Sequence, residues 1–319
     1  MAAIDLSGVT KRYGELMAVR QLDLTVEEGE IYGFLGPNGA GKSTTINMML
    51  DFVRPTAGEV NVLGTDAQRE TTAVRNKIGV LPEGFGVYDR LSGRKHLEFA
   101  IDSKDAAEDP DAVLERVGLT GDGGRKASEY STGMKQRLAL GMALIDEPDL
   151  LILDEPSSGL DPAGAKDMRE IVREEADRGA TVFFSSHVLG QVEAVCDRVG
   201  ILRDGQLVAQ DSIEGLRVAV GSSETLTVTV DAASQDDLEP IQTMEGVSGV
   251  TTDGGTVTVS CDGDTKTNVI TALEDNGVTV KNFQTEEASL EELFFAYTEG
   301  ETADEGTEAA LAAPGEGDT

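Results

Sequence analysis

The chain has 319 residues, with 59 acidic side chains against 26 basic ones and a formal net charge of -33. A chain of this length can bury a substantial apolar core and form two domains. It contains no apolar run near the roughly 18 to 20 residues of a membrane-spanning helix and does not begin like a secretory signal, and its acidity argues against DNA or RNA as the main partner, because phosphate backbones are bound by clustered Lys and Arg.

Strand and helix patterns alternate along the first two thirds of the chain. The segment Val26–Glu30 ends a strand in a turn, and Ile31–Leu35 is a short, largely apolar run typical of a buried strand. Two more buried strands are predicted at Leu150–Leu153 and Thr181–Phe184. This alternation predicts an α/β fold with a mostly parallel sheet and helices on both faces.

A glycine-rich segment follows the strand Ile31–Leu35 and precedes an apolar helical pattern. It reads Gly36-Pro37-Asn38-Gly39-Ala40-Gly41-Lys42-Ser43-Thr44 and matches the phosphate-binding loop G-x-x-x-x-G-K-S in the strand-to-helix context that the motif requires. Backbone N–H groups and the helix N-terminus would bind phosphate oxygens, Lys42 would neutralise the β- and γ-phosphates, and the Ser43 hydroxyl would bind Mg²⁺. The sequence therefore predicts a nucleotide site here.

Two carboxylates follow the buried strand Leu150–Leu153 directly. Asp154 and Glu155 lie at the carboxyl end of this strand, where α/β sheets present their ligands. Asp154 is predicted to hold Mg²⁺ through water, and Glu155 to act as general base on the attacking water in hydrolysis of the γ-phosphate. The guanine-selecting Asn-Lys-x-Asp pattern is incomplete at Asn76-Lys77-Ile78-Gly79, so ATP is preferred to GTP.

The pattern changes near residue 218. Residues 1–218 carry 24 basic and 37 acidic side chains, whereas residues 219–319 carry 2 and 22. Short strands around Leu226, Val257 and Val278 alternate with helical stretches, and their order predicts a small α+β domain of ferredoxin-like topology. We therefore expect domains at 1–217 and 218–298, followed by a disordered acidic tail at 299–319.

The segment Ser289-Leu290-Glu291-Glu292 is typical of a helix capping box. The apolar residues that follow are spaced for one helix face, which would dock on a domain core or, alternatively, bind a partner.

The two cysteines, Cys196 and Cys261, are far apart in the sequence, and we predict that they are reduced residues that pack in the core. Three explanations for the acidity are adaptation of a whole proteome to high salt, which we favour, a functional acidic surface, and an ordinary acidic tail.

Five motifs in order identify a family resemblance. The phosphate loop, Tyr130-Ser131-Thr132-Gly133-Met134-Lys135-Gln136-Arg137, the pair Asp154-Glu155, Ser158-Gly159-Leu160-Asp161 and Ser185-Ser186-His187 together resemble the nucleotide-binding subunits of ATP-binding cassette (ABC) transporters over residues 3 to 217. More narrowly, the chain looks like the ATPase subunits of daunorubicin-type, ABC-2 drug-resistance exporters. The resemblance implies a P-loop ATPase domain with a helical subdomain.

The resemblance also implies roles for single residues. Tyr13 would stack on adenine, and Gly36 to Thr44 would hold the phosphates. Ser131 and Gly133 would contact the γ-phosphate bound by the other subunit of a homodimer. Asp161 would lie at the dimer seam, and His187 would contact the γ-phosphate.

This sequence departs from the family pattern in two places. The usual Leu-Ser-Gly-Gly-Gln signature is altered by Tyr130, Thr132 and Met134, although Ser131 and Gly133 remain. The position that usually presents a Gln to Mg²⁺ and the attacking water is occupied by Glu83. Our hypothesis is that Glu83 still binds the metal and signals the nucleotide state.

The resemblance implies an ATPase, with ATP and Mg²⁺ as cofactors, that dimerises to energise separate integral-membrane permease subunits. We expect it in the cytoplasm, peripheral on the inner face of the cell membrane. An alternative is an ABC-type ATPase that acts on nucleic acid or ribosomes, although the tandem cassettes and insertions of that class are missing. For residues 218–298, the alternative to a dimerising or permease-docking module is a regulatory domain for a small ligand.

Overall fold

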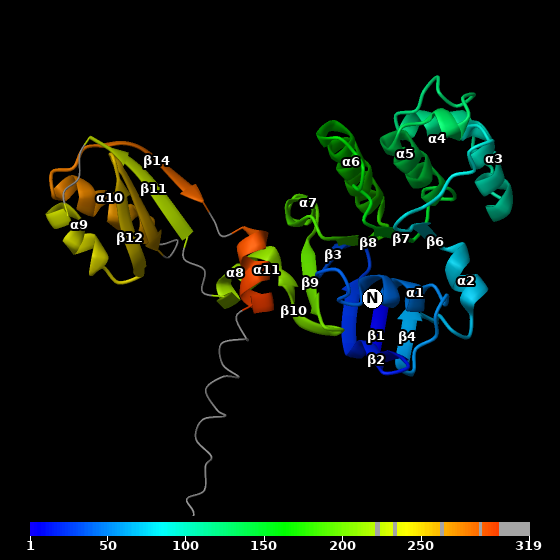
Figure 1. Cartoon of the computed structure of the whole chain (residues 1–319), viewed down its shortest axis with the longest axis horizontal. Helices are drawn as coiled ribbons and strands as arrows, with labels where there is room; N and C mark the ends of the chain where they lie inside the picture. The colour runs from blue at the N-terminus through cyan, green and yellow to red at the C-terminus, as the bar shows by residue number, and fades with distance from the viewer. Residues whose placement is uncertain (221–223, 232–234, 262–264, 287–288, 300–319) are drawn as a thin grey trace, which may run out of the picture. The chain divides into compact units, whose positions relative to one another are not determined.

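The computed structural model describes residues 1–220, 224–231, 235–261, 265–286 and 289–299. The chain divides into two compact units, Met1–Ile213 and Glu214–Thr319 (Figure 1). This division lies just before the boundary expected after residue 217. Of the predicted acidic tail, Glu299 is the last residue of a helix and residues 300–319 lie outside the described residues.

The larger unit is built around a six-stranded sheet in the order β10-β9-β3-β8-β7-β6. Its strands are β10 (Gln206–Ser212), β9 (Arg198–Arg203), β3 (Ile31–Leu35), β8 (Thr181–Ser186), β7 (Leu150–Asp154) and β6 (Ile78–Leu81). All neighbouring strands are parallel except β10, which pairs antiparallel with β9. The prediction of a mostly parallel sheet is confirmed.

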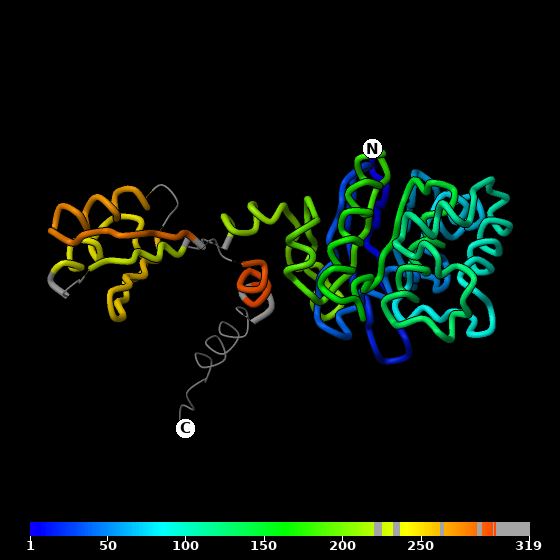
Figure 2. The backbone as a smooth tube through the Cα atoms, turned by 90° about the horizontal axis from the view of Figure 1, so that it is seen from above, coloured from blue at the N-terminus to red at the C-terminus, as the bar shows by residue number. Residues whose placement is uncertain are grey.

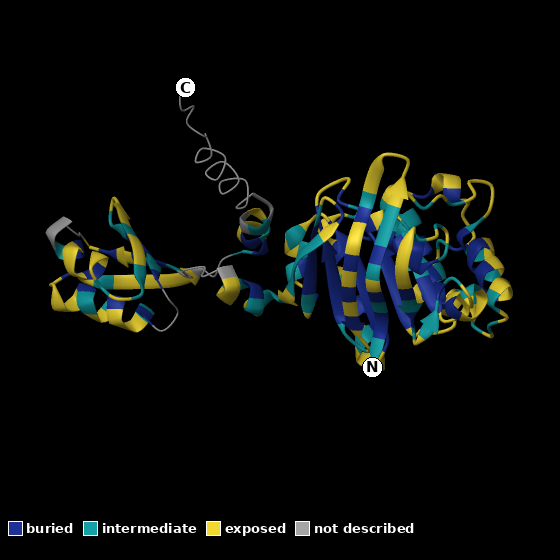
Figure 3. Cartoon of the chain, turned by 90° about the horizontal axis from the view of Figure 1, so that it is seen from below, coloured by how far each residue is buried: buried dark blue, intermediate teal, exposed yellow. Residues whose placement is uncertain are grey.

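A second, antiparallel sheet in this unit was not predicted. It consists of β2 (Leu16–Glu27), β1 (Ala2–Tyr13), β4 (Ala57–Val62) and β5 (Thr65–Asp66), in that order. Apolar residues of this sheet pack with helix α1 (Lys42–Met49) and with β3, β7 and β8 in one buried core. The pairing of β1 with β2 contains several register shifts, which interrupt the simple alternation that would identify a strand from sequence. Figure 3 shows buried and exposed residues along these outer strands.

The remaining helices of the larger unit follow its strands. They are α2 (Thr71–Asn76), α3 (Gly93–Lys104), α4 (Pro110–Arg116), a short 3₁₀ helix (Ala127–Glu129), α5 (Thr132–Ala143), α6 (Pro162–Arg178) and α7 (Leu189–Glu193). Helices α3, α4 and α5 contact one another and form a group at one end of the unit in both views (Figures 1 and 2). This group is the helical subdomain that the family resemblance implies.

The smaller unit contains a four-stranded antiparallel sheet in the order β12-β13-β11-β14. Its elements are α8 (Ile213–Val220), β11 (Glu224–Val230), α9 (Gln235–Gln242), β12 (Val247–Asp253), β13 (Thr256–Cys261), α10 (Lys266–Asp275), β14 (Val280–Glu286) and α11 (Leu290–Glu299). The succession from β11 to β14 has the predicted ferredoxin-like order. Leu226, Val228 and Val230 are buried with α9 and α10 on one face of the sheet.

Local features of both units agree with the sequence. The Ser289 hydroxyl accepts a hydrogen bond from the Glu292 N–H at 3.3 Å, and the Ser289 N–H donates to Glu292 Oε2 at 2.9 Å. This reciprocal pair is the predicted capping box. Cys196 and Cys261 are both buried thiols, as expected for packing residues.

Candidate functional site

The glycine-rich loop lies between β3, which is buried throughout, and α1. Gly41, at the start of α1, has φ +111°, and a Cβ there would lie 2.5 Å from the Ala18 carbonyl oxygen. A Cβ at Gly36 would lie 2.5 Å from the Leu202 carbonyl oxygen. Only glycine fits at these two positions, because neighbouring backbone approaches the loop directly. The motif glycines therefore allow the loop to pack against the backbone behind it.

Lys42 is 8% exposed, and its ammonium group donates hydrogen bonds to the carbonyls of Gly36 at 2.6 Å and Pro37 at 3.4 Å. Burial lowers the pKa of Lys42, whereas the carboxylates of Glu155, Asp154 and Glu83 raise it. The Lys42 cation is therefore held inside the curve of the loop and is electrostatically coupled to all three predicted catalytic or metal-binding carboxylates.

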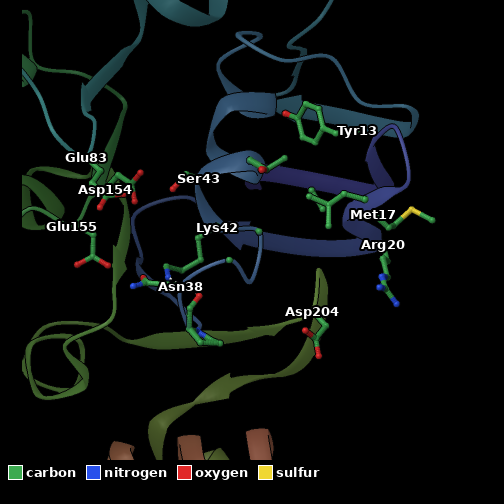
Figure 4. Close-up of a pocket in the computed structure, with 16 residues that line it drawn as sticks. Tyr13, Met17, Arg20, Asn38, Lys42, Ser43, Glu83, Asp154, Glu155 and Asp204 are labelled. Atoms are coloured by element: carbon green, nitrogen blue, oxygen red, sulfur yellow. Dashed lines mark hydrogen bonds between the residues drawn. The ribbon is translucent and has the colours of Figure 1, made fainter.

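A cleft of about 570 Å³ opens in front of the loop (Figure 4). Its lining residues are Tyr13, Leu16, Met17, Ala18, Arg20, Pro37, Asn38, Gly39, Gly41, Lys42, Ser43, Thr44, Glu83, Asp154, Glu155 and Asp204. Two residues of the predicted loop do not line it: Gly36 is backed by Leu202, and Ala40 is buried. In Figure 4 the carboxylates of Glu83, Asp154 and Glu155 lie on one side of Ser43 and Tyr13 lies on the other. These three carboxylates thus form one side of the cleft, opposite Tyr13.

Asp154, at the end of β7, is 5% exposed, and its Oδ1 has no hydrogen-bond partner. Burial raises the pKa of Asp154, the nearby carboxylates of Glu83 and Glu155 raise it further, and the hydroxyls of Ser185 and Ser43 lower it. A buried carboxylate oxygen without a partner is costly unless a ligand or cation neutralises it.

Glu155 follows Asp154 in a left-handed backbone conformation, with φ +51°. Its Oε2 lies 2.8 Å from His187 Nδ1 and accepts a hydrogen bond from the Ser186 hydroxyl at 3.4 Å. Glu155 is 7% exposed, but the His187 side chain is 60% exposed. The ends of β7 and β8 thus bring two predicted residues together, although His187 does not line the cleft.

The other predicted residues lie in a second cleft of about 520 Å³ in the larger unit. Ser131 caps α5 by accepting a hydrogen bond from the Met134 N–H, and Asp161 caps α6 by accepting one from the Gly164 N–H. Ser131, Gly133 and Asp161 line this cleft, which shares no lining residue with the cleft at Lys42. The two halves of the predicted ATP site are therefore separate within one chain.

Comparisons with known proteins identify relatives over nearly the whole chain. Residues 19–158 match the ABC transporter family, and residues 212–298 match the C-terminal domain of DrrA1-3-like ATP-binding proteins. The linearmycin resistance ATP-binding protein LnrL of Bacillus subtilis is 32% identical over 304 residues, covering 92% of this chain and 98% of LnrL. The daunorubicin/doxorubicin resistance ATP-binding protein DrrA of Streptomyces peucetius is 33% identical over 320 residues, covering 97% of this chain and 96% of DrrA.

The chain belongs to the ATP-binding subunits of ABC transporters, of the DrrA-like resistance type. A dimeric ATP-binding cassette, MJ0796, in a post-hydrolysis state bound to ADP and Pi, has a similar fold, with a TM-score of 0.61 and 25% identity over 66% of this chain and 98% of that one. The chain is thus an ATPase that hydrolyses ATP for transport, as the sequence predicted.

The structure adds residues to this ABC subunit's cleft that the motifs did not indicate. Four of them lie in β2, after the turn that follows Tyr13: Leu16, Met17, Ala18 and Arg20. Asp204 comes from the turn between β9 and β10. A polar residue in a short strand-to-strand turn is too common to identify a site from sequence, so only the fold places Asp204 here.

The donors around Asp154 suit Mg²⁺. Carboxylate and hydroxyl oxygens are the ligands that this hard cation prefers, and the unpartnered Asp154 Oδ1 offers one beside Ser43 and Glu83 (Figure 4). Among the described residues no three His, Cys, Asp or Glu side chains form a metal cluster. No helix in the described part of the chain has the length and apolar composition needed to cross a membrane.

Proposed function

We propose that two copies of this ABC subunit bind two MgATP molecules between them. The observation that carries this proposal is the separation of the two clefts: Ser131 and Gly133 line one, and Lys42 and Ser43 line the other. The exposed N-terminus of α5 would meet the nucleotide held by the phosphate loop of the second copy. The dimeric state of the MJ0796 cassette supports this arrangement.

In this dimer, Lys42 and the loop N–H groups bind the β- and γ-phosphates. Mg²⁺, held by Ser43, by Asp154 through water and by Glu83, would neutralise charge on the transferred phosphoryl group. Glu155 accepts the proton of the attacking water. The His187 ring, hydrogen-bonded to Glu155 at 2.8 Å, orients this carboxylate and contacts the γ-phosphate, while Tyr13 stacks on adenine.

ATP binding closes the dimer and hydrolysis reopens it, and this cycle drives separate integral-membrane permease subunits. The ABC subunit would then lie in the cytoplasm at the inner face of the membrane. We propose export of antibiotics or similar toxic compounds, because its relatives are named for resistance to linearmycin and to daunorubicin and doxorubicin. Glu83 signals the nucleotide state to the permease, and Glu83→Ala should uncouple ATPase activity from transport.

Mixing two inactive variants tests the shared site. Lys42→Ala damages the phosphate loop, and Gly133→Asp places a carboxylate where the partner's γ-phosphate would bind. A Cβ at Gly133 meets no atom closer than 3.6 Å, so the second variant should fold. Each homodimer should be inactive, whereas a mixed dimer has one intact site.

Random pairing of equal amounts of the two variants should restore about a quarter of the wild-type sites. Phosphate release that stays at the level of the separate variants, with mixed dimers confirmed by differential tags, would overturn the shared site. Thermal unfolding of each variant should show that both are folded.

A further inference from the structure

The turn between β9 and β10 lies directly behind the phosphate loop. It consists of Asp204 and Gly205, whose φ angles are +48° and +80°. Two successive residues with positive φ are typical of a tight type I′ hairpin. Asp204 lines the nucleotide cleft. Gly205 has no side chain and belongs to none of the sequence motifs described above, so the sequence alone assigns it no role.

Gly205 connects the phosphate loop to β2 through its backbone. Its N–H donates a hydrogen bond to the Ala40 carbonyl at 2.9 Å, and its carbonyl accepts one from the Arg20 N–H at 2.8 Å. Ala40 lies within the phosphate loop but is 3% exposed and does not line the cleft. The bond from Gly205 therefore holds the side of the loop that faces away from the nucleotide.

The fit at Gly205 leaves no room for a side chain. A Cβ there would lie 2.8 Å from the Ala18 carbonyl oxygen and 3.0 Å from Val19 Cα. Both atoms belong to the β2 backbone, which cannot give way as the end of a flexible side chain can. The strands β2 and β9 also pack against the loop glycines. Gly41 faces the Ala18 carbonyl of β2, and Gly36 faces the Leu202 carbonyl of β9.

We propose that Gly205 is a positioning residue for ATP binding, which locks the phosphate loop against β2 in its phosphate-binding conformation. The loop binds phosphate through backbone N–H groups, whose directions depend on the position of the loop backbone. Displacement of the turn would break the bond to Ala40 and shift these groups. A shift of about 1 Å in a binding loop is enough to cost on the order of 100-fold in function.

The variant Gly205→Ala tests this role, with Gly29→Ala as its matched control. Gly29, in the turn before β3, has φ +81°, but a Cβ there would meet no atom within 4 Å. Its N–H donates to the Thr181 hydroxyl, outside the nucleotide cleft. Both variants therefore place an L-residue at nearly the same positive φ, which disfavours L side chains, but only Gly205→Ala also crowds the β2 backbone behind the loop.

We expect Gly205→Ala to raise the Kd and KM for ATP at least about 10-fold with little change in kcat, because the Gly205 backbone bonds to Ala40 and Arg20 and not to Glu155. Gly29→Ala should bind ATP as the wild type does, although both variants unfold at a lower temperature. Kd values for the two variants within about twofold of each other would overturn the proposal.

Two further measurements cover the case in which Gly205→Ala does not fold. Gly205→Asn relieves the backbone strain, because Asn tolerates positive φ, but retains the crowding Cβ, so its ATP affinity should remain low. In the wild-type protein, ATP should slow hydrogen exchange at the Gly205 amide, which is bonded to Ala40. Normal ATP affinity in the Asn variant, or unchanged exchange at Gly205 on saturation with ATP, contradicts the proposed lock.

Discussion

The carboxylate of Glu155 and the imidazole of His187 meet at 2.8 Å, although they follow different strands of the central sheet. The two strand ends also meet through their backbones, since the Glu155 N–H donates to the carbonyl of Ser185, two residues before His187, at 2.9 Å. The adjacent parallel strands β7 and β8 thus end at the same level. This register gives the buried carboxylate of Glu155, which lines the cleft, an exposed imidazole partner.

Replacing Glu155 with Gln should reduce ATP hydrolysis at least about 100-fold, because an amide cannot accept the proton of the attacking water. ATP binding should persist, so a nucleotide-bound dimer should accumulate. Phosphate release and gel filtration with ATP measure the two effects. Glu170→Gln, in an exposed pair with Lys166 on α6, is the control. Wild-type turnover by Glu155→Gln would remove Glu155 as the base.

His187→Ala should lower kcat about 10- to 100-fold by freeing the Glu155 carboxylate and removing a contact to the γ-phosphate. The His187 side chain is 60% exposed, so the free energy of unfolding should change by less than about 0.5 kcal/mol. Steady-state kinetics and urea unfolding together separate the two quantities. A loss of stability that parallels the loss of activity would show a structural role instead.

Asp154→Asn should raise the Tm of the nucleotide-free protein at pH 7. It should also reduce the increase in Tm that MgATP binding produces. Burial raises the pKa of Asp154, so the ionised form opposes folding and this penalty disappears as the pH falls through the folded-state pKa. The difference in Tm between variant and wild type should therefore shrink toward low pH.

Thermal unfolding from pH 7 to pH 5, with and without MgATP, checks this behaviour. Asp149→Asn, an exposed residue just before β7, is the control and should not change Tm. A nucleotide-free Asp154→Asn protein that is less stable than the wild type at pH 7 would mean that the carboxylate makes a structural contact.

An ion-pair cluster around a buried carboxylate joins the helical group to α6. The Glu175 carboxylate, 0% exposed, pairs with Arg116 of α4 and with Arg178 at 2.8 Å. Replacing both Arg116 and Arg178 with Ala leaves the buried Glu175 carboxylate unpaired. This double variant should lose about 3 to 5 kcal/mol of the free energy of unfolding, more than the sum of the losses in the two single variants. Urea unfolding measures this, with Lys166→Ala as the exposed control, expected at about 0 to 1 kcal/mol. Additive, small effects would contradict a shared role.

Sequence reasoning was most effective where chemistry depends on neighbours along the chain. The phosphate loop follows a buried strand, and the carboxylates Asp154 and Glu155 end another, so periodicity and motif agree. The capping box at Ser289 was also predicted because both partners lie within one helical turn.

Contacts that depend on how distant backbones meet were not predicted. The antiparallel sheet contains irregular register, and the hydrogen bond from Gly205 to Ala40 joins residues far apart in the sequence. Neither feature produces a pattern among neighbouring residues of the sequence. The division of the ATP site between two clefts was implied only by the family resemblance, since the spacing of Ser131 and Lys42 does not reveal which cleft each residue lines.

The net charge of -33 leads to the last prediction, that molar KCl raises both Tm and ATPase activity. Like charges on a compact chain repel each other, and the Debye length falls from about 10 Å at 0.1 M salt to about 3 Å at 1 M. Ion pairs such as Arg116–Glu175 are partly buried and lose less to screening than the surface repulsion does. Choline chloride at equal ionic strength should act similarly if screening is the cause. Full stability and activity in low-salt buffer would show that the acidic surface is not a salt adaptation.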